Sequence, residues 1–149
     1  MDKTLLITPR LCKDCGTCES VCDNAAVSVI AFADDEASIA IPVMCMQCEE
    51  AACMDVCPVG ALYRDVDDTV LVDVRRCIGC KLCVGACPFG NIEFNFAEKR
   101  IVKCDLCGGS PDCAKYCPTS AIVYASATAS ALDKKRALAA RFKSLMDVE

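Results

Sequence analysis

Sixteen cysteines among 149 residues constrain this chain more than any other feature. They fall into four quartets, and each quartet ends in the spacing C-x3-C. The quartets are Cys12, Cys15, Cys18 and Cys22; Cys45, Cys48, Cys53 and Cys57; Cys77, Cys80, Cys83 and Cys87; and Cys104, Cys107, Cys113 and Cys117. So much cysteine, with few aromatic residues and no Trp, indicates that cross-links replace part of an ordinary hydrophobic core.

Disulfides would need an oxidising compartment, and nothing in the sequence predicts export. The apolar run near the N-terminus is too short for a signal peptide, and Pro9 and Arg10 follow it. The only paired arginines, Arg75 and Arg76, lie far inside the chain. The longest apolar runs are shorter than a membrane span. We therefore expect a cytoplasmic protein without a membrane span, whose cysteines bind metal.

The spacing of the quartets favours iron–sulfur clusters over zinc. The chain has no His, which many structural zinc sites use and which Rieske centres require. The first and third quartets match the C-x2-C-x2-C-x3-C pattern of [4Fe–4S] ferredoxins, and the other two lengthen only the middle gap. A proline follows three of the quartets. The sequence predicts four [4Fe–4S] clusters, with all-cysteine zinc as the alternative.

The geometry of a cubane explains this spacing. A short loop can wrap around three of the four iron corners, and its backbone N–H groups turn toward the anionic sulfides. The fourth cysteine of such a run binds the other cluster of a pair. From the residues alone, the quartets could pair in sequential order or as outer and inner pairs, because the linkers between them are similar in length.

Short strands are predicted around the quartets. Alternating apolar and β-branched residues predict strands at 26–30, 60–63, 91–94 and 121–124, after the four quartets, and at 69–73 and 100–103, before the last two. The repeating unit is strand, cluster loop, helical turn and strand. We therefore expect an α+β fold built from four half-modules of the bacterial ferredoxin type.

The segment 126–149 has a different composition, with five basic and three acidic side chains and no cysteine. Ser130 and Asp133 resemble a helix start. Leu138, Phe142, Leu145 and Met146 would then form one apolar stripe on a C-terminal helix. This helix could fold back on the cluster modules, or it could dock onto a partner or onto another copy of the chain.

The motifs Cys57-Pro58-Val59-Gly60 and Cys77-Ile78-Gly79-Cys80 resemble bacterial ferredoxins. The whole run over about residues 3–125 resembles the four-cluster electron-transfer subunits of molybdenum and tungsten oxidoreductases, formate and carbon monoxide dehydrogenases, and hydrogenases. Three features carry this likeness: Asp23 follows the first quartet in place of proline, the third quartet ends in Cys87-Pro88-Phe89-Gly90, and the fourth opens with Lys103-Cys104-Asp105-Leu106-Cys107.

The resemblance implies that the outer quartets pair with each other and that the inner quartets do the same. The implied ligand sets are Cys12, Cys15, Cys18 and Cys117 (cluster A); Cys45, Cys48, Cys53 and Cys87 (cluster B); Cys77, Cys80, Cys83 and Cys57 (cluster C); and Cys104, Cys107, Cys113 and Cys22 (cluster D). Residues 1–40 and 99–125 would form an outer two-cluster module, and residues 41–98 an inserted inner module.

The resemblance also implies electron relay within a cytoplasmic multi-subunit oxidoreductase. The expected partner is a catalytic subunit, a tungsten or molybdenum enzyme that oxidises aldehyde or formate, with a flavin or ferredoxin protein as a further partner. The chain carries no motif for chemistry on a substrate, and with a net charge of −5 nothing in it predicts a nucleic-acid partner. A free polyferredoxin or an assembly factor are the alternatives.

Three lysines, Lys13, Lys81 and Lys115, lie inside the cluster loops. A cation there could raise the reduction potential of the nearest cluster. The ordinary role of such a lysine is that of a solvated loop residue.

Overall fold

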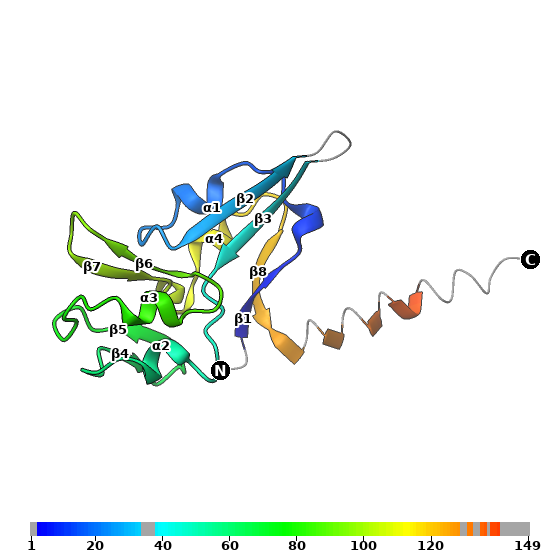
Figure 1. Cartoon of the computed structure of the whole chain (residues 1–149). Helices are drawn as coiled ribbons and strands as arrows, with labels where there is room; N and C mark the ends of the chain where they lie inside the picture. The colour runs from blue at the N-terminus through cyan, green and yellow to red at the C-terminus, as the bar shows by residue number, and fades with distance from the viewer. Residues whose placement is uncertain (1–2, 34–37, 129–130, 133–134, 137, 141–149) are drawn as a thin grey trace, which may run out of the picture.

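Antiparallel strand pairs and single-turn helices form the framework of the computed structural model, which describes residues 3–33, 38–128, 131–132, 135–136 and 138–140 (Figure 1). The elements run in the order β1 (Lys3–Ile7), η1 (Pro9–Leu11), α1 (Thr17–Ser20), β2 (Val27–Ala33), β3 (Ser38–Met44), α2 (Ala52–Asp55), β4 (Leu62–Arg64), β5 (Val70–Val72), α3 (Leu82–Ala86), β6 (Ile92–Asn95), β7 (Arg100–Lys103), η2 (Leu106–Gly109), α4 (Asp112–Lys115) and β8 (Ile122–Ser126).

The strands pair two by two, and one pair joins the ends of the folded region. Three pairs are hairpins of neighbouring strands: β2 with β3, β4 with β5, and β6 with β7. The fourth pairs β1 with β8, so that Lys3 lies opposite Ser126 and Ile7 opposite Ile122. All other elements lie between these two strands in the sequence, and the chain therefore closes on itself.

All six predicted strands are present, within three residues of their expected ends, as β2, β4, β5, β6, β7 and β8. The sequence did not predict β1 or β3. Strand β3 contains Pro42, opposite Val29, and a proline can be tolerated there because both strands of a two-stranded sheet are edges. The module boundary expected after residue 40 falls inside β3, and the one expected after residue 98 separates the paired strands β6 and β7.

Each single-turn helix carries the third cysteine of a quartet. Left-handed residues start two of these helices: Gly16 (φ +69°) precedes α1 and Lys81 (φ +64°) precedes α3. Helix α3 ends where Cys87 adopts extended backbone, because Pro88 disfavours helical geometry in the residue before it. Helix α1 packs against α4, and α2 packs against α3. The third cysteines of the outer quartets are thus brought to one half of the molecule, and those of the inner quartets to the other.

Two small cores follow this division except at Cys45, which belongs to the second quartet and lies in the first core. One core contains Leu5, Val27, Met44, Leu106 and Ile122, together with Cys18, Cys45, Cys104 and Cys113. The other contains Ala51, Leu62, Val70, Ile92 and Ile101, together with Cys83. We call the part around the first core the outer half and the part around the second core the inner half. Cysteine is a substantial part of the first core, whereas the second core contains Cys83 and has partly buried cysteines packed against it.

The described tail residues, 127–128, 131–132, 135–136 and 138–140, are helical and exposed. Leu138 has 53% of its surface exposed. The other members of the expected stripe, Phe142, Leu145 and Met146, lie outside the described residues. No helix within the described part of the chain is long and apolar enough to cross a membrane.

The closing pair β1–β8 generates a prediction about stability. Ile122 is 1% exposed in the outer core, whereas its neighbour Val123 is 40% exposed on the other face of β8. We expect Ile122→Ala to lower the thermal unfolding midpoint by about 5 °C or more, because a buried Ile-to-Ala change leaves a cavity. Thermal unfolding followed by circular dichroism measures this. Val123→Ala is the matched control, and an equal fall of the unfolding midpoint in both variants would contradict the placement of Ile122 in the outer core.

Candidate metal centres

The fourth cysteine of each quartet receives backbone hydrogen bonds just after its loop. The N–H groups of Ala26, Ala61 and Asn91 donate to the Sγ atoms of Cys22, Cys57 and Cys87 at 3.3, 3.2 and 3.4 Å. In each case the donor lies four residues after the cysteine, where the chain turns into the following strand. N–H donors favour the thiolate, which is the form that binds metal.

Cys117 has the same surroundings in the fourth quartet. Burial acts to raise the pKa of Cys117, but the backbone N–H groups of Ile122 and Thr119 and the Thr119 hydroxyl together hold that pKa below its usual value. For Cys57, the backbone N–H groups of Leu62 and Ala61 likewise outweigh burial, and the pKa is lowered. The surroundings of the Cys117 and Cys57 sulfur atoms therefore favour the thiolate.

The third cysteines, on the single-turn helices, lie deeper. Burial raises the pKa of Cys18, Cys53 and Cys83, and it raises the pKa of Cys113 to about 11. Burial also raises the pKa of Cys104, to about 12. Such thiols must lose a proton when they bind metal, so that binding releases protons. Cys15, Cys80 and Cys107, the second cysteines of three quartets, are exposed instead.

Cysteines of different quartets lie close enough to influence one another in the outer half. After burial, the largest causes of the raised pKa of Cys113 are the thiolates of Cys107 and Cys22. Cys22 also acts to raise the pKa of Cys107, and Cys117 acts on Cys15 in the same direction. The first and fourth quartets, which are far apart in sequence, therefore meet here.

The inner half shows the same kind of meeting. Cys45 and Cys87 both act to raise the pKa of Cys53, and Cys77 and Cys80 act in the same way on Cys83. A cavity at this end of the molecule is lined by four cysteines of two quartets, Cys45, Cys48, Cys53 and Cys87, with Lys103 and Gln47 beside them. Cys57 packs against the same core as Cys77 and Cys83.

The donor set fits a cubane. Four thiolates around one cluster supply the all-sulfur ligation that [4Fe–4S] centres use, and N–H donors to sulfur are the usual means of setting their potentials. Among the described residues, no three His, Cys, Asp or Glu side chains converge closely enough to hold a single metal ion. A cubane holds its four thiolates at its corners, farther apart than the ligands of one tetrahedral ion.

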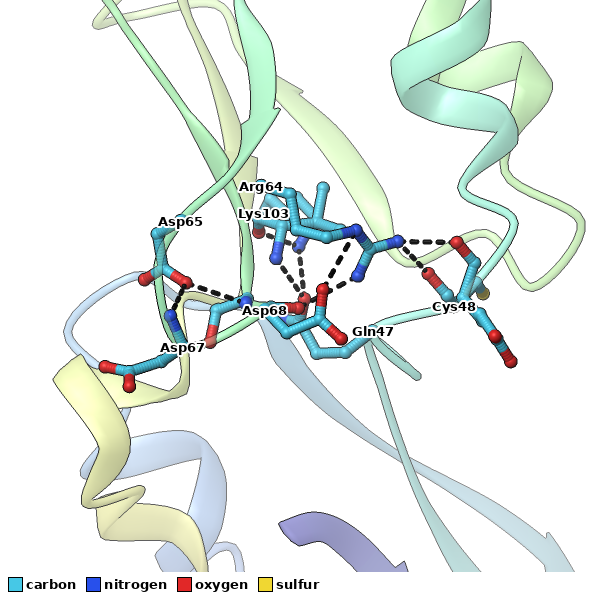
Figure 2. A network of polar contacts seen from close by, with 10 residues as sticks. Gln47, Cys48, Arg64, Asp65, Asp67, Asp68 and Lys103 are labelled. Carbon is cyan, nitrogen blue, oxygen red and sulfur yellow. Dashed lines mark hydrogen bonds and ion pairs between the residues drawn. The ribbon is translucent and has the colours of Figure 1, made fainter. Parts of the chain in front are cut away.

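The loop of the second quartet is held by a polar network that the sequence did not reveal (Figure 2). Nη2 of Arg64 donates to the carbonyl oxygens of Cys48 and Glu49, at 2.8 and 2.6 Å. Its Nη1 donates to the Asp68 carbonyl at 2.9 Å, and its Nε lies 3.4 Å from the Asp68 carboxylate. Arg64 therefore joins the cysteine loop to the β4–β5 turn.

The lysines singled out in the sequence lie at the surface or against aromatic rings. Lys13 is exposed. The Lys81 ammonium lies over the rings of Phe94 and Phe96, 4.6 and 4.5 Å from their centroids, and that of Lys115 lies over Tyr116. Among the described residues, Lys103 is the buried lysine. In the sequence it is only the first residue of the fourth motif.

The sequence profile of the 4Fe-4S dicluster domain family matches residues 36–127. The chain belongs to this family. The match covers the second, third and fourth quartets, and the first quartet lies outside it. The prediction of [4Fe–4S] binding is thereby confirmed, while the number of four clusters stays a prediction.

Several curated proteins are similar to parts of the chain. Hydrogenase-4 component A of Escherichia coli is 37% identical over 90 residues, which are 56% of this chain and 43% of that protein. An uncharacterized ferredoxin of Methanocaldococcus jannaschii is 37% identical over 82 residues, covering 54% and 50%. The thiosulfate reductase electron transfer subunit of Salmonella typhi is 37% identical over 94 residues, covering 54% and 49%. The chain spans about half the length of these curated relatives.

The Arg64 network generates a prediction about cluster retention. We expect Arg64→Leu to speed the loss of iron to a chelator about tenfold, because groups that orient metal ligands commonly change affinity by that factor or more. Iron release, followed by absorbance of the chelate, measures the rate. Arg100→Leu is the matched control: Arg100 pairs with Glu98 at the exposed β6–β7 turn and holds no cysteine loop. Equal rates in both variants would contradict the role of Arg64.

Proposed function

We propose that this chain is an electron-transfer subunit that relays electrons through four [4Fe–4S] clusters within a multi-subunit oxidoreductase. The observation that carries the proposal is the closeness of cysteines from different quartets in both halves of the molecule. That closeness would put the clusters in neighbouring pairs, as a relay requires. When bound, each cubane supplies one-electron redox chemistry.

The proposed ligand sets are those that the family resemblance implies. Cys117 acts to raise the pKa of Cys15, so the two lie close together, which supports a set of Cys12, Cys15, Cys18 and Cys117. Cys22 acts to raise the pKa of both Cys107 and Cys113, which supports a set of Cys104, Cys107, Cys113 and Cys22. The cavity of Cys45, Cys48, Cys53 and Cys87 supports the third set. The fourth set, Cys77, Cys80 and Cys83 with Cys57, fits the presence of Cys57, Cys77 and Cys83 in or against one core.

In this arrangement an inner two-cluster module is inserted into an outer one. The pairing of β1 with β8 supports it, because it joins the segments that come before the first quartet and after the last. The β2–β3 and β6–β7 hairpins favour module boundaries near residues 44 and 103, a few residues later than the sequence suggested.

The chain itself has no proposed substrate site, and the chemistry would belong to a catalytic partner. The names of two relatives, a hydrogenase component and a thiosulfate reductase electron transfer subunit, support a partner of that kind. A tungsten or molybdenum enzyme that oxidises aldehyde or formate is the specific candidate. The exposed cysteines Cys15, Cys80 and Cys107 would bring cluster edges near the surface, where electrons can enter and leave.

A free polyferredoxin that carries electrons between separate enzymes is the second candidate. The likeness to a ferredoxin of Methanocaldococcus jannaschii favours it. The two candidates differ in whether the chain is held in a complex.

Cluster content is the first test. We expect the anaerobically purified chain to contain about sixteen irons and as many sulfides, because four cubanes hold four of each. Iron and sulfide analysis with electron paramagnetic resonance (EPR) of the reduced protein measures this, and neighbouring clusters should give coupled spin signals. About eight irons, or stoichiometric zinc, would refute the four-cluster relay.

Ligand variants test the pairing. We expect Cys117→Ala and Cys12→Ala to remove the same EPR signal, because both residues belong to one proposed set. Cys22→Ala and Cys107→Ala should together remove a different one. Under sequential pairing, Cys117 would share a cluster with residues of the third quartet, and Cys12→Ala would then affect another signal.

Stable assembly separates the two candidate functions. We expect the tagged full chain, expressed in its own host, to co-purify with a catalytic subunit. Deletion of residues 127–149, which include the exposed Leu138, should weaken this association if the tail docks onto the partner. Purification of the full chain alone, with all clusters loaded, would favour the free carrier.

A further inference from the structure

Lys103 is a buried ammonium group whose hydrogen-bond partners are all neutral. The residue is 7% exposed. Its Nζ atom donates to the carbonyl oxygens of Val70 and Cys104, at 2.6 and 3.0 Å, and to the Gln47 amide oxygen at 3.3 Å. Three acceptors match the three N–H bonds of a protonated lysine. These partners solvate the charge without neutralising it.

This ammonium lies where the two halves of the molecule meet. Val70 belongs to β5 of the inner half, and Cys104 opens the last quartet in the outer half. Gln47, in the loop of the second quartet, ties both sides together: its Oε1 accepts from the Val70 N–H at 2.9 Å, and its Nε2 donates to the Cys104 carbonyl at 2.9 Å (Figure 2). Gln47 adopts a left-handed backbone (φ +49°) at this point.

Cysteines of two proposed clusters surround the same group. Lys103 lines the cavity formed by Cys45, Cys48, Cys53 and Cys87, and it directly precedes Cys104 in the chain. Its charge acts to lower the pKa of both Cys53 and Cys104, against the opposing effect of burial. Cys45 of the second quartet and Cys104 of the fourth lie in the same core, and Cys45 acts to raise the pKa of Cys104.

A buried cation affects reduction more than an exposed one. Reduction adds one negative charge to a cluster, and a nearby positive charge stabilises the reduced state. The stabilisation is weakly screened when the cation is shielded from water and salt. The exposed Lys13, although it lies between two cysteines, is screened by solvent.

We propose that Lys103 is a tuning residue shared by two clusters, the one held by Cys45, Cys48, Cys53 and Cys87 and the one held by Cys104, Cys107, Cys113 and Cys22. Its fixed charge raises the reduction potentials of both relative to the other two clusters. The two clusters whose cysteine ligands lie nearest Lys103 would thereby be the ones most easily reduced. This inference rests on the ligand sets proposed above.

The test is an EPR-monitored redox titration of the loaded full chain. We expect Lys103→Gln to lower the potentials of two clusters and to leave the other two in place. For each affected cluster, the ratio of reduced to oxidised form at a fixed applied potential should fall about tenfold, which corresponds to about 59 mV for a one-electron couple. Lys103→Arg, which keeps the charge, should restore the wild-type potentials.

Lys13→Gln is the matched control, because it removes the same charge from a cluster loop at an exposed position. The signal absent in Cys22→Ala should be among those shifted by Lys103→Gln, and the signal absent in Cys117→Ala should not. No shift beyond that of Lys13→Gln, or an equal fall in all four potentials, would overturn the inference.

If the Lys103→Gln variant does not retain its clusters, a second variant tests the same inference. Gln47→Glu keeps Lys103 and the oxygen that accepts from it, but places a carboxylate beside the ammonium. The same two potentials should fall, and unchanged potentials would overturn the inference. An unmodified chain that lacks four clusters would refute the proposed function instead, so the two failures are distinguishable.

Discussion

The pairing of β1 with β8 is the constraint on which the rest of the arrangement depends. It joins residues 3–7 to residues 122–126 across almost the whole folded region. Closing so long a loop has a cost in chain entropy, which the buried side chains of Leu5 and Ile122 help to offset. Because the first quartet follows β1 and the fourth precedes β8, this one ladder brings the outer quartets together.

Neither half has a large apolar core, and cysteines lie in or against both cores. In the proposed holoprotein each fourth cysteine ties one loop to another, so that folding and cluster loading would be coupled. The backbone N–H groups four residues after Cys22, Cys57 and Cys87 then donate to cluster-binding sulfur atoms at the point where each loop ends.

The polar junction of Lys103, Gln47 and the Cys104 carbonyl connects the halves by hydrogen bonds. Buried polar groups of this kind are stable only when every donor and acceptor finds a partner, and no buried side-chain nitrogen or oxygen among the described residues lacks one. Asn91 adds a further link, from its side chain to the Met44 carbonyl at 2.7 Å. The junction thus holds the two halves in a defined relation, and a defined relation is what electron transfer between them would require.

The sequence by itself determined the cysteine loops, the α+β class and six of the strands, because these depend on short spacings and local alternation. It did not reveal β1 or β3: Pro42 interrupts the strand signal of β3, and β1 is recognisable only from its distant partner β8. Nor did it distinguish Lys103 from Lys13, Lys81 and Lys115, since all four lie in or beside a cysteine motif. Only the tertiary structure decided which lysine is buried and which single-turn helices pack together, because burial and long-range packing arise from contacts between segments that are far apart in the chain.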